Sequence, residues 1–300
     1  MIDKEILQKY GIKPTSYKKQ KSTVTVKTLD KSYVFKPRKV NKKSVFNYLQ
    51  TRNFRYFPML YNDQENDGYD IFEYTPSFEI PNYDKALDLM RIVSLLHLKT
   101  THYQEVDIDE IKQIYEKTTA SIEELSFYYN ELFLELEKEI YMAPYSYLLL
   151  RNSSKIRSLL YYCKDEIDAW YELVSKKDKI RVCLIHNNLS LDHLLSSDNS
   201  YLISWDAAAE DFPVYDLVKF YQKDGKNYDF ASLFKVYEEH YPLSIDEKKL
   251  LFVLISLPEK ISFSSNAYEN TLKVKRLLDD VYKTDKFISP YYTSKQADEN

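Results

Sequence analysis

The sequence predicts an α+β protein with a small β-rich N-terminal lobe over residues 1–74 and a larger, mostly helical lobe over residues 75–290. Short runs that alternate between apolar and polar residues are confined to the first part, and apolar residues at helical spacing fill most of the second. The charge changes near the same place. Met1 to Asn62 holds 15 Lys and Arg against 3 Asp and Glu, whereas the rest of the chain holds 27 against 43. Residues 291–300 are expected to form a flexible tail.

An antiparallel hairpin is predicted at the centre of the N-terminal lobe. In STVTVKTLDKSYVFKP the alternating runs Val24–Val26 and Tyr33–Phe35 are separated by a polar turn. Pro37 ends the second run because it has no N–H to donate across a strand pair. A helix is expected from Lys42 to Thr51, and the segments YFPMLY and YDIFEYTP add two strand candidates.

The larger lobe is predicted to consist mainly of helices. Asp107 and Glu110 form a capping signal for a long helix that ends before Pro144, and Ser244 and Glu247 form one for a shorter helix. The other predicted helices are 83–100, 145–150 and 154–174.

One segment of the larger lobe is predicted to be a strand, a loop and a second strand. The strands are IRVCLIH at 180–186 and YLISWD at 201–206, and the loop between them begins with NNLSLDH. Side chains two positions apart on a strand point the same way. Ser204 and Asp206 are therefore expected to share one face.

Composition excludes several classes of site. Three glycines in 300 residues leave no glycine-rich loop for phosphate, and the 29 tyrosines, spread over helices and strands alike, are interpreted as packing residues. Cys163 and Cys183 lack metal-ligand spacing and are expected to be reduced thiols. No apolar run reaches the ~20 residues of a membrane span, and the N-terminus lacks the apolar centre of a signal peptide, so a cytoplasmic location is expected.

Several motifs together carry a resemblance to a known family. They are YVFKP, IFEYTP, the loop beginning HNNLSLDH, and DFPVYDL. With them the chain resembles the aminoglycoside phosphotransferase and choline kinase superfamily. Within it, the chain looks most similar to the spore coat protein S group of bacterial kinase-like proteins, as a degenerate member. The resemblance implies a two-lobed protein-kinase-like fold.

The resemblance also implies roles for individual residues. Lys36 takes the place of the lysine that holds nucleotide phosphates, and Glu73 and Tyr74 lie in the linker that pairs with adenine. His186 corresponds to the histidine that holds the loop backbone, and Asp216 buttresses that loop. ATP and Mg²⁺ are the cofactors that the family would use, although the residues themselves establish neither.

The departures from the family pattern fall on the catalytic chemistry. The family loop reads His-Gly-Asp, four residues, then Asn, and the next strand carries Ile-Asp. Here Asn188 occupies the position of the catalytic aspartate, and an amide has no useful basicity. His193 and Ser204 occupy the two metal-ligand positions, and neither supplies the negative charge that suits Mg²⁺.

Two carboxylates are candidate substitutes for the missing metal ligands. Asp206 could present its carboxylate to a metal, or it could end its strand and cap the following turn. Asp192, next to His193, is a weaker candidate. Lys36 lacks the usual acidic partner, because the expected helix KKSVFNYLQ contains no glutamate.

Three functions remain open from the sequence. The first is a pseudokinase or severely impaired phosphotransferase, with a spore-coat-related role if the resemblance holds, which would place the chain in the forespore or spore coat. The second is an active ATP-dependent small-molecule kinase that acts on a hydroxyl group and uses Asp206 and Asp192 in displaced roles. The third is a protein whose basic N-terminal lobe binds an anionic partner. The small-molecule or protein partner itself is not identified.

Overall fold

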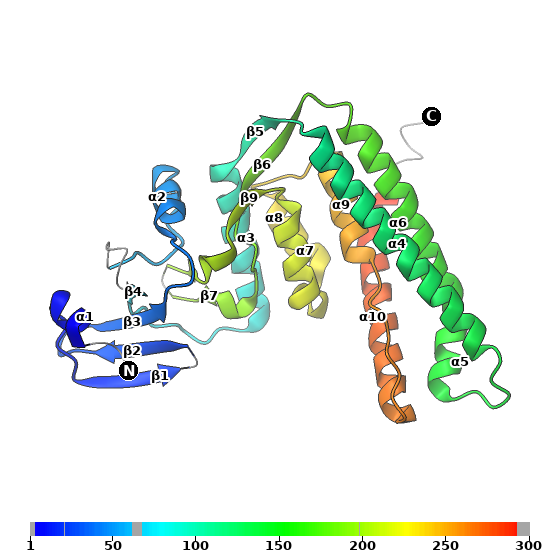
Figure 1. Ribbon diagram of the computed structural model, residues 1–300, viewed down its shortest axis with the longest axis horizontal. Helices are drawn as coiled ribbons and strands as arrows, with labels where there is room; N and C mark the ends of the chain where they lie inside the picture. The colour runs from blue at the N-terminus through cyan, green and yellow to red at the C-terminus, as the bar shows by residue number, and fades with distance from the viewer. Residues whose placement is uncertain (1–3, 21, 62–67, 198, 293–300) are drawn as a thin grey trace.

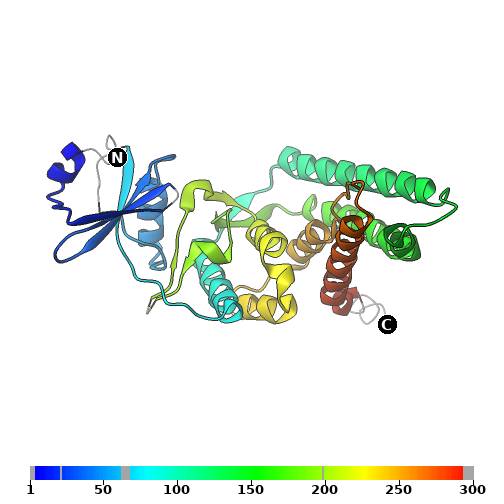
Figure 2. The ribbon, with the colours of Figure 1, turned by 90° about the horizontal axis from the view of Figure 1, so that it is seen from below.

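The computed structural model describes residues 4–20, 22–61, 68–197 and 199–292, which form two lobes (Figure 1). In both views the N-terminal sheet lies at one end of the molecule and long helices make up the other end (Figures 1 and 2). The predicted α+β class, with a small antiparallel sheet followed by a larger helical part, is confirmed. None of the helices in these ranges has the length and apolar character needed to cross a bilayer.

The N-terminal sheet has four antiparallel strands in the order β1-β2-β3-β4. They are β1 Ser16–Gln20, β2 Thr23–Lys27, β3 Ser32–Pro37 and β4 Tyr69–Glu73. In the predicted hairpin Val26 lies opposite Tyr33, and both side chains are buried against α1 (Lys4–Lys9). Because strand side chains alternate, the other face of the sheet carries Lys36 and, directly opposite it on β4, Asp70.

Two expectations for the N-terminal lobe need correction. YFPMLY is not a strand, since only Leu60 forms an isolated bridge to Phe72. Conversely, SYKKQ forms β1, which was not predicted. All five of its residues are exposed, so the segment lacks the alternation of apolar and polar residues that predicts a strand. The expected helix is α2, Lys43–Thr51, which begins one residue later than predicted.

The larger lobe contains the five predicted helices and three that were not predicted, α7, α8 and α10. In chain order they are α3 Asn82–Thr100, α4 Ile108–Leu136, α5 Pro144–Arg151, α6 Ser153–Val174, α7 Val214–Lys223, α8 Phe230–Glu238, α9 Ile245–Ser256 and α10 Ala267–Tyr292. Asp107 caps α4 by accepting the backbone N–H groups of Asp109 and Glu110. Ser244 and Glu247 form the capping box of α9. Residues 291 and 292 of the expected tail belong to α10, and residues 293–300 lie outside the described residues.

Short strands of the larger lobe flank the loop HNNLSLDH at residues 186–193. They are β5 His102–Glu105, β6 Lys179–Ile185, β7 Leu194–Leu195, β8 Tyr201–Leu202 and β9 Ala209–Asp211, with short 3-10 helices η2 Leu191–His193, η3 Trp205–Ala207 and η4 Gly225–Asn227. The predicted strand YLISWD is wrong beyond Leu202. Ser204 has a left-handed backbone with φ 68°, and the chain then turns into η3. Ser204 and Asp206 therefore do not share a strand face.

An aromatic cluster joins the two lobes beside this turn. Trp205 is 2% exposed and meets the rings of Phe46, Phe54 and Phe57 edge-on, with centroids 6.2 to 6.4 Å apart. Phe46 and Phe57 stack on each other at 5.0 Å. Since Phe46 belongs to α2 and Trp205 to η3, the cluster fixes the N-lobe helix against the turn that carries Asp206.

Removing the Trp205 ring should therefore destabilise the whole protein. For Trp205→Ala we expect a loss of about 3–5 kcal/mol in the free energy of unfolding, because the substitution leaves a cavity among three rings. The matched control is Phe127→Ala, whose ring is 70% exposed. It should change the stability by no more than about 0.5 kcal/mol. Urea unfolding followed by far-UV circular dichroism measures both, and equal losses would contradict a packing role for Trp205.

Candidate active-site loop and its ionic network

Asp216 organises the loop that follows β6. It lies in the first turn of α7, is fully buried, and accepts the backbone N–H of His186 at 2.7 Å and that of Asn187 at 2.6 Å. A carboxylate that receives two backbone donors holds that stretch of chain in one conformation. Asn187 has a φ of 60°, which asparagine tolerates better than most residues, so it can stand where the resembled family has glycine.

A buried histidine on α3 supports Asp216 from the other side. His97 Nε2 lies 3.1 Å from the Asp216 carboxylate, and His97 Nδ1 lies 2.8 Å from the Tyr237 hydroxyl. Because a carboxylate only accepts, His97 donates from Nε2 and accepts the Tyr237 O–H at Nδ1. Burial raises the pKa of Tyr237 well above its ordinary value, so it remains a donor. No sequence motif marked His97, which lies 119 residues from Asp216.

His186 ties the loop to the next segment. Its Nε2 lies 2.9 Å from the carbonyl oxygen of Ile203, so Nε2 carries the proton and donates it. Its Nδ1 has no hydrogen-bond partner among the described residues. Burial lowers the pKa of His186, which keeps the ring neutral. The ring also packs edge-on against Trp205 at 4.8 Å, next to the lobe junction.

Asn188 and His193 are brought together, but by a contact to the backbone. His193 Nδ1 donates to the carbonyl oxygen of Asn188 at 2.6 Å, which stabilises the loop and does not involve the Asn188 amide. Neighbouring Asn187 accepts the Lys219 ammonium with both its backbone and its side-chain oxygen. The loop is therefore well held, while the position of the family's catalytic base carries an uncharged amide.

Lys36 enters an ion pair that sequence reasoning missed. Its ammonium lies 2.5 Å from Asp206 Oδ2, across the junction between the lobes. Asp206 Oδ1 lies 2.7 Å from Lys42, which in turn lies 2.6 Å from Asp70 Oδ2. Arg38 Nε completes the row at 2.7 Å from Asp70 Oδ1. We call this row of five alternating charges the ionic network.

The burial of the ionic network makes its ion pairs energetically important. Lys42 is 3% exposed and Asp70 1%, so each charge needs its partners to offset the loss of water. Burial by itself would raise the pKa of Asp206, but the ammonium groups of Lys36 and Lys42 outweigh it and lower that pKa. Lys36 thus has an acidic partner, although not the glutamate that the helix of the resembled family would supply. The partner comes from η3 in the larger lobe, since α2 supplies no carboxylate.

The residues present do not fit a magnesium site. Asp206 is held by two ammonium groups, Ser204 has a left-handed backbone conformation, and Asp192 is exposed on η2. Within the described ranges there is no cluster of three or more His, Cys, Asp or Glu side chains that could hold a metal ion. Mg²⁺ requires near-octahedral oxygen ligands, with carboxylates free to bind it.

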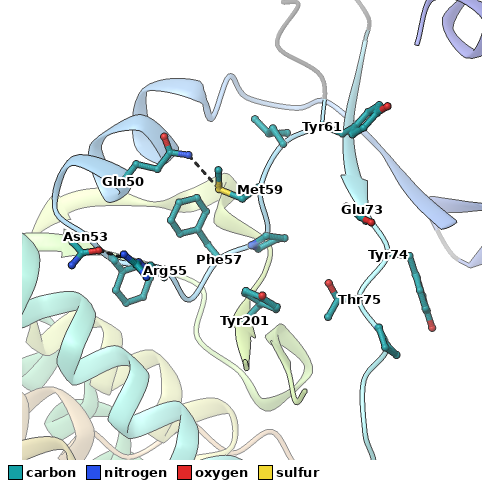
Figure 3. Close-up of a pocket in the computed structure, with 14 residues that line it drawn as sticks. Gln50, Asn53, Arg55, Phe57, Met59, Tyr61, Glu73, Tyr74, Thr75 and Tyr201 are labelled. Atoms are coloured by element: carbon teal, nitrogen blue, oxygen red, sulfur yellow. Dashed lines mark hydrogen bonds between the residues drawn. The ribbon is translucent and has the colours of Figure 1, made fainter. Parts of the chain in front are cut away.

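Glu73 and Tyr74 lie apart from the ionic network. Glu73 pairs with Lys31 at 2.8 Å, and the Tyr74 N–H donates to the Ser32 carbonyl at 2.8 Å. Figure 3 shows both residues beside a pocket of about 850 Å³ between the linker and the segment after α2. Its wall also contains Gln50, Phe57, Met59, Tyr61 and Tyr201, but neither Lys36 nor Asp206.

No protein-family model and no curated protein matches the sequence. Solved structures do match. An aminoglycoside phosphotransferase from Alicyclobacillus acidocaldarius subsp. acidocaldarius DSM 446 superposes with a TM-score of 0.69, at 10% identity over 99% of this chain and 97% of that chain. The spectinomycin phosphotransferase APH(9)-Ia, in complex with ADP and spectinomycin, gives 0.51 at 14% identity over 94% of this chain and 97% of that chain. The chain therefore has the two-lobed kinase-like fold of these two phosphotransferases.

Proposed function

We propose that this protein is a pseudokinase, a kinase-fold protein in which phosphotransfer is absent or severely impaired. The observation that carries the proposal is the ion pair between Lys36 and Asp206. In active kinases the corresponding lysine holds nucleotide phosphates. Here an internal carboxylate takes the place of those anions, and any ATP phosphate has to displace it or meet its negative charge.

The other substitutions support the same proposal. Asn188 cannot accept the proton of a substrate hydroxyl, and general-base catalysis contributes about 10²–10⁴-fold to typical rates. Phosphoryl transfer depends mainly on positioning and on metal electrostatics. Replacement of the family's Asn and Asp metal ligands by His193 and Ser204 therefore weakens the larger contribution. The loop itself is retained, because Asp216 and His186 hold its backbone without any catalytic step.

An active kinase that uses Asp206 and Asp192 is less well supported. Asp206 would have to leave both Lys36 and Lys42 in order to bind a metal, which would leave the buried Lys42 with only Asp70. The fold neighbour APH(9)-Ia binds ADP, so nucleotide remains the ligand to test at this cleft.

Two further roles rest on the sequence alone and remain proposals. An anionic partner at the basic N-terminal lobe has exposed lysines available, including Lys18 and Lys19 on β1. Retention on heparin that weakens steeply with salt would support it. A location in the forespore or spore coat is proposed from the resemblance to the spore coat protein S group. Fractionation of sporulating cells tests it.

ATP with Mg²⁺ should give little or no thermal stabilisation of the isolated protein. The reason is that Asp206 neutralises Lys36 and that two ammonium groups already engage the Asp206 carboxylate. A ligand that binds the folded state at about 100 times its dissociation constant would add about 2.7 kcal/mol, which is readily seen as a higher melting temperature. An active aminoglycoside phosphotransferase serves as the positive control. A clear increase that disappears on chelation of the metal would overturn the proposal.

Loss of the Asp206 charge should destabilise the protein at neutral pH and much less in acid. We expect Asp206→Asn to cost about 1.5–3 kcal/mol at neutral pH, the usual range for hydrogen bonds to charged groups. Because the folded-state pKa of Asp206 is lowered, the contribution is complete above its unfolded value of about 3.9 and is lost as the pH falls through the folded value.

Urea midpoints from pH 7 down to about pH 3 measure this difference, a range that spans the unfolded pKa of aspartate. Asp192→Asn, at an exposed carboxylate, is the matched control and should show no comparable pH dependence. A stability difference for Asp206→Asn that stays constant across this range would show that the ionic network does not hold the fold.

A further inference from the structure

A second large pocket lies in the helical lobe, away from the ionic network. Its volume is about 850 Å³, within the range of small-molecule sites. Three segments form its wall, namely the end of α7 with η4, the connection between α9 and α10, and the middle of α10. Asp224, at the end of α7, accepts the N–H of Leu191, so this wall is tied to the loop that carries Asn188.

Charged side chains of α10 form a stripe along this pocket. Lys273, Arg276, Asp280 and Lys283 all line it, and their spacing of three, four and three residues places them on one face of the helix. A stripe of this kind could be a solvated surface whose charges cancel. Whether it is one depends on where each charge finds its partner.

The cations of the stripe are not cancelled by nearby carboxylates. Lys273 donates to the Ser262 carbonyl at 2.7 Å and Lys283 to the Lys226 carbonyl at 3.0 Å, and a carbonyl dipole does not neutralise an ammonium. Arg276 forms no hydrogen bond or ion pair with any described residue. No carboxylate of the described chain lies within ion-pair distance of these three groups.

The acidic groups at the pocket are mostly engaged elsewhere or exposed. Asp280 is taken up by Lys226 at 2.7 Å, and Glu259, 83% exposed, also approaches Lys226 at 3.4 Å. Lys260 pairs with Glu124 outside the pocket. Asp279 is the remaining acid on the wall and is exposed. The wall therefore has an excess of positive charge in the part of the chain where acidic residues outnumber basic ones.

A neutral donor completes the wall. Ser256, at the end of α9, lines the pocket and is 2% exposed, yet its hydroxyl has no hydrogen-bond partner among the described residues. An unpaired buried hydroxyl is unfavourable by about 1–3 kcal/mol, so such groups usually have a partner. An oxygen-rich ligand would supply one.

We propose that this pocket binds a small molecule with two or more oxyanion groups, phosphates or carboxylates. Lys273, Arg276 and Lys283 would receive the charges, and a ligand rich in amines would meet the same three cations and be repelled. The pocket's size favours a compact ligand over a polymer. The proposal is independent of whether the protein transfers phosphate.

Calorimetric titration of the full chain with inorganic pyrophosphate and with citrate tests the proposal. Saturable binding of either supports it, and the tighter of the two identifies phosphate or carboxylate as the preferred group. Affinity should fall at least tenfold between about 50 and 200 mM salt if several charge contacts form. No saturable binding of either anion at low salt, or tighter binding of the polyamine spermine, would overturn it.

Charge-neutralising variants locate the site. Lys273→Gln, Arg276→Gln and Lys283→Gln together should weaken binding at least tenfold. The matched control removes three cations elsewhere, with Lys117→Gln, Lys275→Gln and Lys286→Gln, and should leave affinity within about twofold apart from the general salt-dependent term. Equal weakening in both would refute a local site. If the triple variant fails to fold, Arg276→Gln alone, at an exposed side chain, should still weaken binding severalfold.

Discussion

The carboxylate of Asp206 is the contact on which the arrangement of this cleft depends. Each of its oxygens meets one ammonium, Lys36 on β3 and Lys42 just before α2, so one side chain from the larger lobe fixes two points of the smaller lobe. Because Lys42 is almost fully buried, the attraction acts in a medium that screens charges poorly. The turn at Ser204 and the aromatic packing of Trp205 bring Asp206 to that position.

The loop after β6 is held in place by contacts that do not involve the Asn188 side chain. Asp216, His97 and Tyr237 form a buried chain of hydrogen bonds that ends on the backbone of His186. Every atom in it supports the position of the loop, and none requires a carboxylate at Asn188. Selection for a stable loop therefore places no constraint on the side chain at position 188.

Local patterns predicted the parts of this structure that local forces determine. The alternation around Val26 and Tyr33 indicated the hairpin, and Asp107 indicated the start of α4, because strand faces and helix caps are set by neighbours in sequence. The apolar run that ends in Asp206 looked like a strand, and only packing against the other lobe turns it. Lys42 and Asp206 are likewise far apart in the chain, so no local sequence pattern could predict that they pair.

The burial of Lys42 between two acids also limits which substitutions the protein can accept. Replacing Asp206 alone leaves a buried cation with one carboxylate that Arg38 already shares, and replacing Lys42 alone leaves two buried or half-buried carboxylates facing each other. Either single step is unfavourable, so the members can change readily only as a set. A lineage that acquires this arrangement is expected to keep it, since replacing its members one at a time passes through less stable intermediates.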